Sequence, residues 1–297
     1  MHIEPFEYLR PSSLREFEGL LARYGGDAHI LAGGTDLLVL VKEKLLSPRV
    51  VVDIGSLEAL QGIAWDEEAG LTILAGTKVA RIEADPLVRT HAPALAYAAA
   101  QLGSAQVRHM ATMAGNVCHG SPSAETPPVL LAQGAQVVLA REGGERSLPI
   151  EAFWLAYRKT ALAPGEYLKA FRLPPLPPRA AVAYRFRGLR RAMEIDMVNV
   201  ACYLELDEAG QTARRVRIAL GAVGPIPYRA TQAETALTAQ PVGPEFAAQA
   251  GERAAAEARP IDDVRASAAY RTRMVRVLVR RAVAECIETI RQGEGTR

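Results

Sequence analysis

A pair of glycines near the start of the chain has the composition of an anion-binding turn. Residues 30–37 read Ile-Leu-Ala-Gly-Gly-Thr-Asp-Leu, so an apolar run leads into two glycines, a hydroxyl and a carboxylate. Glycine tolerates positive φ and lets a ligand approach the main chain. Consecutive N–H groups ahead of a helix can hold a phosphate. Neither GxGxxG nor a Walker motif is present, so a plain tight turn is the simpler alternative for these residues alone.

A second segment rich in small and polar residues follows about eighty positions later. Residues 111–125 contain Gly115, Gly120, Asn116, several hydroxyls and the carboxylate of Glu125, between two apolar stretches. We interpret this segment as a loop with many hydrogen-bonding groups. Together, the two glycine segments could hold opposite parts of one elongated ligand.

Metal and thiol chemistry find little support in the sequence. The three cysteines, Cys118, Cys202 and Cys286, are far apart, which excludes a disulfide framework and leaves too few thiolates for an iron–sulfur cluster. We expect them to be buried apolar residues, with Cys118 the possible exception because of its loop. The histidines have no Cys or Asp partner at metal-ligand spacing. We therefore expect no metal site from these residues, and we interpret His109 and His119 as hydrogen-bonded loop residues and not as catalytic bases.

The elements expected around residues 30–37 form a small α/β unit. Ser13 and Glu16 predict a capping box for a helix that ends at the glycines 25–26. A strand then enters the glycine turn, a helix runs to Leu46, and the β-branched run 50–54 predicts a strand buried on both faces. The turn then lies at the C-terminal end of its strand, where ligands of open α/β sheets bind.

The pattern changes after residue 56. It predicts two hairpins, two helical stretches, a stiff Pro-rich boundary, a pair of strands and a long amphipathic helix. The two hairpins are expected at 63–75 and 136–146, and the two helical stretches run to Val88 and, rich in alanine, to Leu102. The Pro-rich boundary is 174–178, and the pair of strands is 200–206 and 215–220. One face of the long helix carries Tyr270, Met274, Leu278, Ala282, Cys286 and Ile290.

Length and composition exclude several classes of protein. The 297 residues suffice for about two domains with a substantial core, and 49% hydrophobic with 23% charged residues is ordinary for a globular chain. No apolar run approaches the roughly 20 residues of a membrane span, and the first residues do not resemble a signal peptide. We expect a cytoplasmic protein. A net charge of +2, without zinc-finger spacing or interleaved basic and aromatic residues, argues against nucleic-acid binding.

Three motifs taken together resemble one family. They are Ala32-Gly33-Gly34-Thr35-Asp36, Thr112-Met113-Ala114-Gly115-Asn116 and Ser121-Pro122-Ser123-Ala124-Glu125. In this order and spacing they resemble the FAD-binding medium subunit of the molybdenum hydroxylases, the family of carbon monoxide dehydrogenase and xanthine dehydrogenase. Residues 187–199, 224–230 and 268–271 resemble segments of that family's C-terminal domain. The resemblance covers nearly the whole chain.

The resemblance implies an α+β fold. A vanillyl-alcohol-oxidase (PCMH)-type FAD-binding domain would cover residues 1–176, as two α+β subdomains at 1–55 and 56–176. Residues 177–297 would form a CO dehydrogenase flavoprotein C-terminal-like domain, with a small antiparallel sheet and helices. FAD would lie in the cleft between the two subdomains.

The resemblance also implies which residues contact FAD. The first turn would bind the pyrophosphate through backbone N–H groups, and the second segment would approach the ribityl chain and the flavin. Two further positions match residues at or near the isoalloxazine ring. The expected cofactor-binding residues are Ile30, Leu31, Ala32, Gly33, Gly34, Thr35, Asp36, Leu37, Gly76, Ala111, Thr112, Gly115, Asn116, Cys118, Glu125, Leu168 and Arg187.

Four positions depart from the family pattern. Ala114 replaces a glycine, Glu125 an aspartate, His119 a polar Asn or Thr, and Arg187 a lysine. The methyl group of Ala114 demands negative φ or a slightly wider loop. Glu125 keeps the charge but reaches one methylene further, and Arg187 keeps a cation whose planar fork differs from an ammonium.

The resemblance implies an electron-transfer role within a larger complex. A molybdenum hydroxylase oxidises its substrate at molybdenum and sends electrons through two [2Fe–2S] clusters to FAD. Since this chain cannot hold those clusters, they would belong to a small [2Fe–2S] subunit, beside a large molybdopterin subunit, in a dimer of heterotrimers. The chain would be an oxidoreductase subunit that passes electrons from its FAD to an external acceptor, without catalytic residues of its own.

Two alternatives remain at the level of sequence. One is a stand-alone FAD-dependent oxidoreductase of the same fold, such as the cell-wall precursor reductase. The other is a flavin-free structural or maturation paralogue, which the changes at Ala114 and Glu125 make conceivable. On composition alone, an arginine cluster is as consistent with a solvated or subunit-contacting edge as with a cofactor site. The cluster consists of Arg185, Arg187, Arg190 and Arg191.

Overall fold

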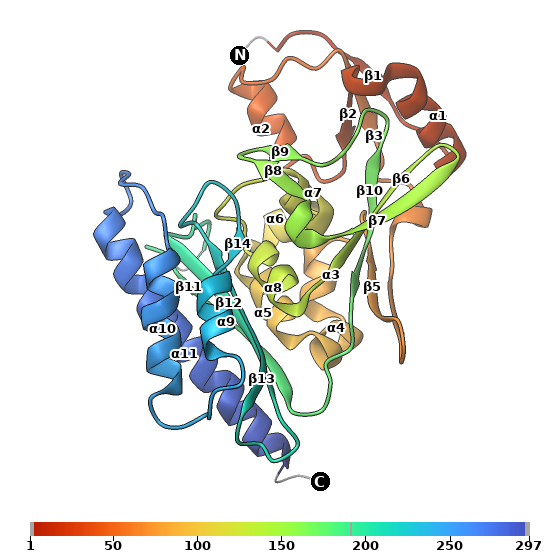
Figure 1. The fold of residues 1–297 in the computed structure, drawn as a ribbon. Coiled ribbons are helices and arrows are strands. Elements are labelled where there is room, and N and C mark those ends of the chain that lie inside the picture. Colours follow the sequence, from red (N-terminus) through yellow and green to blue (C-terminus); the bar gives the residue numbers. More distant parts are fainter. Residues whose placement is uncertain (1–2, 191, 295–297) are drawn as a thin grey trace.

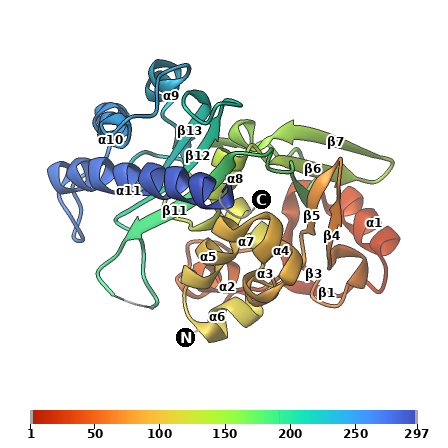
Figure 2. The ribbon, with the colours of Figure 1, turned by 90° about the horizontal axis from the view of Figure 1, so that it is seen from below.

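Three sheets follow one another along the chain in a computed structural model that describes residues 3–190 and 192–294; Arg191 lies outside the described residues. The sheets have three, five and four strands, and a two-stranded hairpin accompanies them. Figures 1 and 2 show the helices α3 to α8 gathered between the second and third sheets, with α9 to α11 on the other side of the third. The expected α+β fold is confirmed.

The first sheet is parallel, with β3 (Val50–Asp53) between β1 (Glu7–Leu9) and β2 (Ala28–Leu31). The three valines of β3 are buried, as the β-branched run predicts. Helix α1 (Leu14–Tyr24) packs on it through Phe17 and Leu21 and is followed by the 3₁₀ turn η1 (Gly25–Asp27). These elements place the first glycine turn directly after β2.

The ends of α1 and α2 test the helix predictions. The side chain of Ser13 accepts a hydrogen bond from the Glu16 N–H, 3.2 Å away, so Ser13 caps the helix as predicted. The carboxylate of Glu16 accepts from the Ser12 N–H at 2.7 Å, one residue earlier than the predicted capping box requires. Helix α2 (Leu37–Lys42) is shorter than predicted. Lys44 has φ of +59°, and the N–H groups of residues 45 and 46 both turn back to the Leu40 carbonyl. The helix therefore stops before Leu46.

The second sheet is antiparallel, and the late strand β10 (Tyr167–Leu173) lies at its centre. On one side β10 pairs with β5 (Gly70–Leu74), which continues to β4 (Ile63–Asp66). On the other it pairs with β6 (Gln136–Arg141), which continues to β7 (Gly144–Pro149). Both predicted hairpins are present. The remaining short elements are η2 (Glu58–Leu60), η3 (Ile150–Ala152), β8 (Trp154–Ala156) and β9 (Lys159–Thr160).

Six short helices connect β5 to β6: α3 (Val79–Ala84), α4 (Pro86–His91), α5 (Pro93–Gln101), α6 (Ala105–Met110), α7 (Met113–Cys118) and α8 (Thr126–Gln133). The single helical stretch predicted through Val88 is wrong, because Asp85 is extended ahead of Pro86 and its side chain caps the next helix at the Leu87 N–H, 2.9 Å away. The prediction of one loop over 111–125 is also wrong, because the Thr112 side chain caps α7 inside that segment.

The third sheet is antiparallel, in the order β11 (Ala180–Arg187), β12 (Val198–Leu206), β13 (Ala213–Gly221) and β14 (Tyr228–Arg229). All of β12 is buried. Ala201 and Tyr203 belong to the core built mainly from residues 71–173, whereas the alternate residues of β12 belong to a second core. That second core includes residues of α9 (Thr231–Leu237), α10 (Phe246–Glu257) and α11 (Ala268–Glu294). The third sheet is therefore covered on both faces (Figure 2).

Candidate cofactor-binding site

The first glycine turn presents a row of free main-chain donors. Gly34 has φ of +72°, which confirms the positive φ expected of the turn. Within the described part of the chain, the backbone N–H groups of residues 32–36 donate no hydrogen bond. In folded proteins, backbone N–H groups are normally paired with a hydrogen-bond acceptor. A row of unsatisfied donors at a turn fits an oxygen-rich anion such as a diphosphate.

The second segment lies directly against this turn. A Cβ atom on Gly33 would lie 2.3 Å from the Met110 carbonyl oxygen and 2.8 Å from the Ala111 Cα, so the two backbones approach as closely as glycine allows. Nε2 of His119 lies 3.8 Å from Oδ1 of Asp36. Burial lowers the pKa of His119, although Asp36 opposes the shift. The two segments therefore form one site.

Polar side chains organise the second segment from within. Thr112 accepts from the Gly115 N–H at 3.1 Å, which holds the first turn of α7. On that helix, Asn116 donates to Oε2 of Glu125 at 3.3 Å and accepts from Thr126 Oγ1 at 2.7 Å. Ala114 lies in the same helix without positive φ, so the extra methyl group noted in the sequence is accommodated.

Glu125 is the acidic residue of this segment, and the pKa of its carboxyl group is strongly shifted. Burial, with a contribution from Asp196 on the approach to β12, raises the pKa of Glu125 to about 8. Burial also raises the pKa of Asp196 to about 6. At neutral pH the two groups therefore hold a proton in the interior.

Asp196 belongs to a buried polar cluster that the sequence analysis missed. Its Oδ2 accepts from Asn199 Nδ2 at 3.0 Å and from the Tyr184 hydroxyl at 3.1 Å. Asn199 Nδ2 also lies 3.2 Å from the Ala124 carbonyl, beside Glu125. The Oδ1 atom of Asn199 is buried without a hydrogen-bond partner in the described chain. The only signal in the sequence was the resemblance of 187–199, which singled out a segment and not these side chains.

Three further expected residues, Gly76, Leu168 and Arg187, lie outside the two segments. Gly76 forms a tight turn, where its N–H donates to the Leu60 carbonyl at 2.6 Å. Leu168 is buried on β10. Arg187 ends β11, and its Nε donates to the Tyr270 hydroxyl on α11 at 3.2 Å. The side chain of Arg187 is thus bonded to the C-terminal helix α11 and not to either glycine segment.

Cys118 is half-buried, whereas Cys202 and Cys286 are buried. Burial raises the pKa of the Cys118 thiol to about 12, so the thiol is neutral near pH 7.

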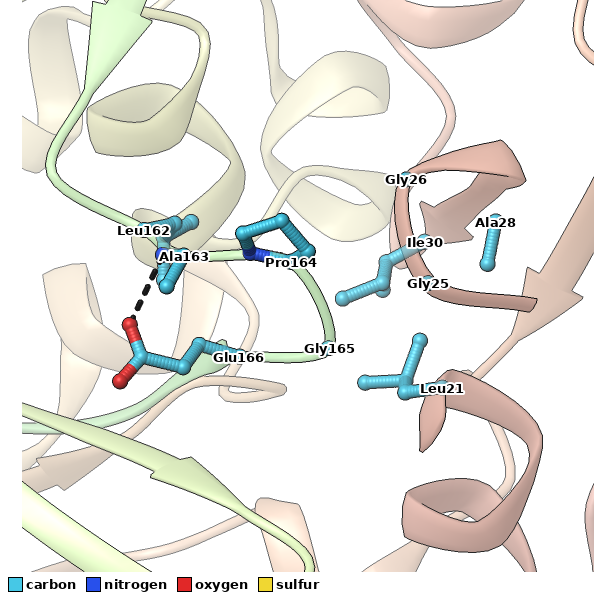
Figure 3. A pocket seen from close by; sticks show the side chains of 10 residues that line it. All are labelled: Leu21, Gly25, Gly26, Ala28, Ile30, Leu162, Ala163, Pro164, Gly165 and Glu166. Carbon is cyan, nitrogen blue, oxygen red and sulfur yellow. Dashed lines mark hydrogen bonds between the residues drawn. The ribbon is translucent and has the colours of Figure 1, made fainter. Parts of the chain in front are cut away.

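Ile30 lines a hollow of about 270 Å³ between the end of α1 and residues 162–166 (Figure 3). The carboxylate of Glu166 in its wall accepts from the Ala163 N–H and pairs with Arg146. Since the other lining residues are apolar or glycine, this hollow has no free charged group for a ligand.

Other site types have no support in the described ranges 3–190 and 192–294. There, no three His, Cys, Asp or Glu side chains are grouped as metal ligands. Among the same residues, no helix has the length and apolar character needed to cross a membrane.

Comparison with known proteins identifies the family. Residues 4–176 match the family described as FAD binding domain in molybdopterin dehydrogenase, and residues 183–286 match the CO dehydrogenase flavoprotein C-terminal domain. The chain is 31% identical to the carbon monoxide dehydrogenase medium chain of Hydrogenophaga pseudoflava, over 94% of this chain and 96% of the relative. It is 30% identical to a putative xanthine dehydrogenase FAD-binding subunit of Escherichia coli K12, over 94% and 95% respectively.

Solved structures agree with the sequence comparisons. A carbon monoxide dehydrogenase from Hydrogenophaga pseudoflava that lacks the Mo-pyranopterin moiety of its cofactor matches with a TM-score of 0.90 and 32% identity, covering 96% of this chain and 98% of that chain. Quinoline 2-oxidoreductase from Pseudomonas putida 86 matches with a TM-score of 0.89 and 28% identity, covering 98% and 99%. This chain therefore belongs to the family of FAD-binding medium subunits of carbon monoxide dehydrogenase- and xanthine dehydrogenase-type molybdenum hydroxylases, and is an oxidoreductase flavoprotein subunit.

Proposed function

We propose that this subunit holds FAD where its two glycine segments meet, and that it relays electrons from the [2Fe–2S] clusters of a partner subunit to an external acceptor. The observation that carries the proposal is the row of unsatisfied N–H groups at residues 32–36, which lies against residues 110–111 of the second segment. These donors fit the diphosphate of FAD, and the adjoining α7 offers polar groups for the rest of the cofactor.

The two segments would bind different parts of FAD. The turn at 32–36 would bind and orient the diphosphate through its main chain, so its contribution depends little on side-chain identity. Asn116 and Glu125 would face the ribityl hydroxyls, with Glu125 held neutral by burial and therefore able to donate as well as accept. FAD itself supplies the ability to take up and release electrons. We retain the other expected contacts, including Leu168 and Arg187, as part of this proposal.

The electron source would lie on other chains. With three dispersed cysteines, this chain lacks the four ligands that a [2Fe–2S] cluster requires. The relatives are named medium chain or subunit, which supports partner subunits in general. We propose a small [2Fe–2S] subunit and a large molybdopterin subunit, arranged as a dimer of heterotrimers.

The proposed domains are 1–176, with subdomains 1–55 and 56–176, and 177–297. The buried cluster of Asp196, Asn199 and Tyr184 would join the two domains, because Asn199 donates to the Ala124 carbonyl of the FAD-binding part. In this arrangement the C-terminal domain supports the second glycine segment through the hydrogen bond of Asn199 to Ala124. Loss of this support would loosen the cofactor without removing a direct contact.

The proposal can be tested by co-producing this chain with candidate small and large subunits. We expect a tagged chain to retain both partners and to show the absorbance of oxidised flavin. After rapid partial reduction of the complex, stopped-flow spectra should show the iron–sulfur absorbance recovering as the flavin absorbance is bleached. A complete complex that is colourless in the flavin region would refute FAD binding. A bound flavin that stays oxidised while the clusters remain reduced would refute the relay.

A further inference from the structure

Lys78 occupies the point where the two glycine segments meet, and the sequence analysis did not single it out. Its Nζ donates to the Met110 carbonyl oxygen at 2.9 Å. The same oxygen lies 2.3 Å from the position that a Gly33 Cβ would take. The Lys78 ammonium and the Gly33 backbone are therefore neighbours of one carbonyl group. The cation lies beside the turn whose main-chain donors are free.

The backbone around Lys78 is fixed against the second segment. The Val79 N–H donates to the Ala111 carbonyl at 2.9 Å, and Lys78 forms an isolated β-bridge with Thr112. Because its main chain is held there, the side chain of Lys78 needs no rearrangement to reach the junction of the segments. Such preorganisation lowers the entropy lost when a flexible lysine orders around a ligand.

The ammonium of Lys78 has no anionic partner in the described part of the chain. No carboxylate lies within 4 Å of its Nζ there, unlike Lys169, which pairs with Glu145. Asp53 acts on Lys78 only through a longer-range attraction, and its own oxygens accept from the Tyr8 hydroxyl and the Gly55 N–H. Burial lowers the pKa of Lys78, whereas Asp53 raises it. A half-buried cation bonded to one neutral carbonyl would gain from an anion.

We propose that Lys78 is a further FAD-binding residue, whose ammonium pairs with the diphosphate held by residues 32–36; this inference rests on the proposed FAD site. Main-chain N–H groups orient a diphosphate but carry no net charge, so they leave its negative charge without a counter-ion. An ammonium is a compact cation that serves as a phosphate ligand elsewhere in proteins. Lys78 supplies that charge from the residue ahead of α3, which is bonded to the second segment, and so ties both segments to one group of the cofactor.

The decisive variant is Lys78→Gln, because glutamine removes the charge while it can still donate to the Met110 carbonyl. The matched control is Lys42→Gln, which removes the same charge from an exposed position at the end of α2. Each variant is prepared as the assembled complex, FAD is removed, and rebinding of FAD is titrated by flavin fluorescence. Thermal unfolding of the FAD-free complexes is measured in parallel.

We expect Lys78→Gln to bind FAD about 10- to 100-fold more weakly, the range of one charge-assisted hydrogen bond. The FAD-free unfolding midpoint should not change, Lys42→Gln should bind as the unaltered complex does, and Lys78→Arg should recover much of the affinity. Equal affinity in Lys78→Gln would overturn the proposal. A fall in the FAD-free midpoint that accounts for the whole loss would also overturn it, since Lys78 would then be structural. If the unaltered complex fails to bind FAD, the proposed function itself fails.

Discussion

Replacing Gly33 by alanine tests the contact between the two glycine segments. The added methyl group would lie 2.3 Å from the Met110 carbonyl oxygen and 2.8 Å from the Ala111 Cα. Both atoms belong to the main chain, so no side chain can rotate away. Since nonbonded heavy atoms rest about 3.5 Å apart, the segments must separate by about 1 Å.

The size of the effect follows from this separation. Overpacking of this kind destabilises a protein by about 1–3 kcal/mol, which would lower the unfolding midpoint by about 2–10 °C in a chain of this size. FAD binding should suffer more than stability, because the displaced turn carries the main-chain donors at 32–36. A loss of three good donors at about 1 kcal/mol each would weaken binding by about two orders of magnitude.

The assay measures the FAD content and the FAD affinity of the assembled complex. Gly19→Ala is the matched control, because Gly19 lies inside α1 with nothing within 4 Å of the added Cβ. That control should be neutral, or more stable by up to about 1 kcal/mol. If Gly33→Ala keeps both the FAD content and the unfolding midpoint of the control, then the close approach of the two segments is not what positions the cofactor.

Three further predictions concern the supporting structure. Because the pKa of Glu125 is raised from 4.5 to about 8, mainly by burial and also by Asp196, the folded state retains a proton that the unfolded state releases. The free energy of unfolding should therefore fall between about pH 5 and pH 8, and Glu125→Gln should flatten this dependence in denaturant titrations; a rise over this range would contradict the assignment. Arg271 is buried and donates to the Met197 carbonyl at 2.5 Å and to the partly exposed Asp263 at 2.7 Å, so Arg271→Ala should destabilise the chain by about 1–3 kcal/mol, the cost of leaving a buried carbonyl without its donor, and Arg271→Lys should recover only part. Cys118 is half-buried and burial raises the pKa of its thiol to about 12, so it should react slowly with thiol reagents in the folded complex at pH 8; labelling as fast as that of an exposed free thiol would contradict the raised pKa.

The parts of the fold that the sequence predicts well are those with strong local patterns. The β-branched run of β3 and the Ser13 cap of α1 were both read correctly, because burial and capping act within a few residues. The positive φ of Gly34 follows from the same local logic. The motif order singled out two segments that the structure brings together, and it did so through the resemblance and not through any pattern of hydrophobicity.

The parts that the sequence did not predict depend on distant contacts. The helix α7 was missed, because its six residues include glycine and asparagine, and it is held by the Thr112 cap. Lys78 looks like any lysine ahead of a helix until Met110, 32 positions later, is placed beside it. The cluster of Asp196 and Asn199 likewise exists only once β12 packs against the loop ahead of α8.

The central position of β10 has a consequence for how the newly made chain matures. Its two neighbours, β5 and β6, are both made before it. Until residue 173 has emerged from the ribosome, each of them keeps an open edge that could pair with another chain. A polypeptide that ends before β10 would expose two separate hairpins with unpaired edges instead of one sheet. The second sheet can therefore be completed only after more than half of the chain has been synthesised.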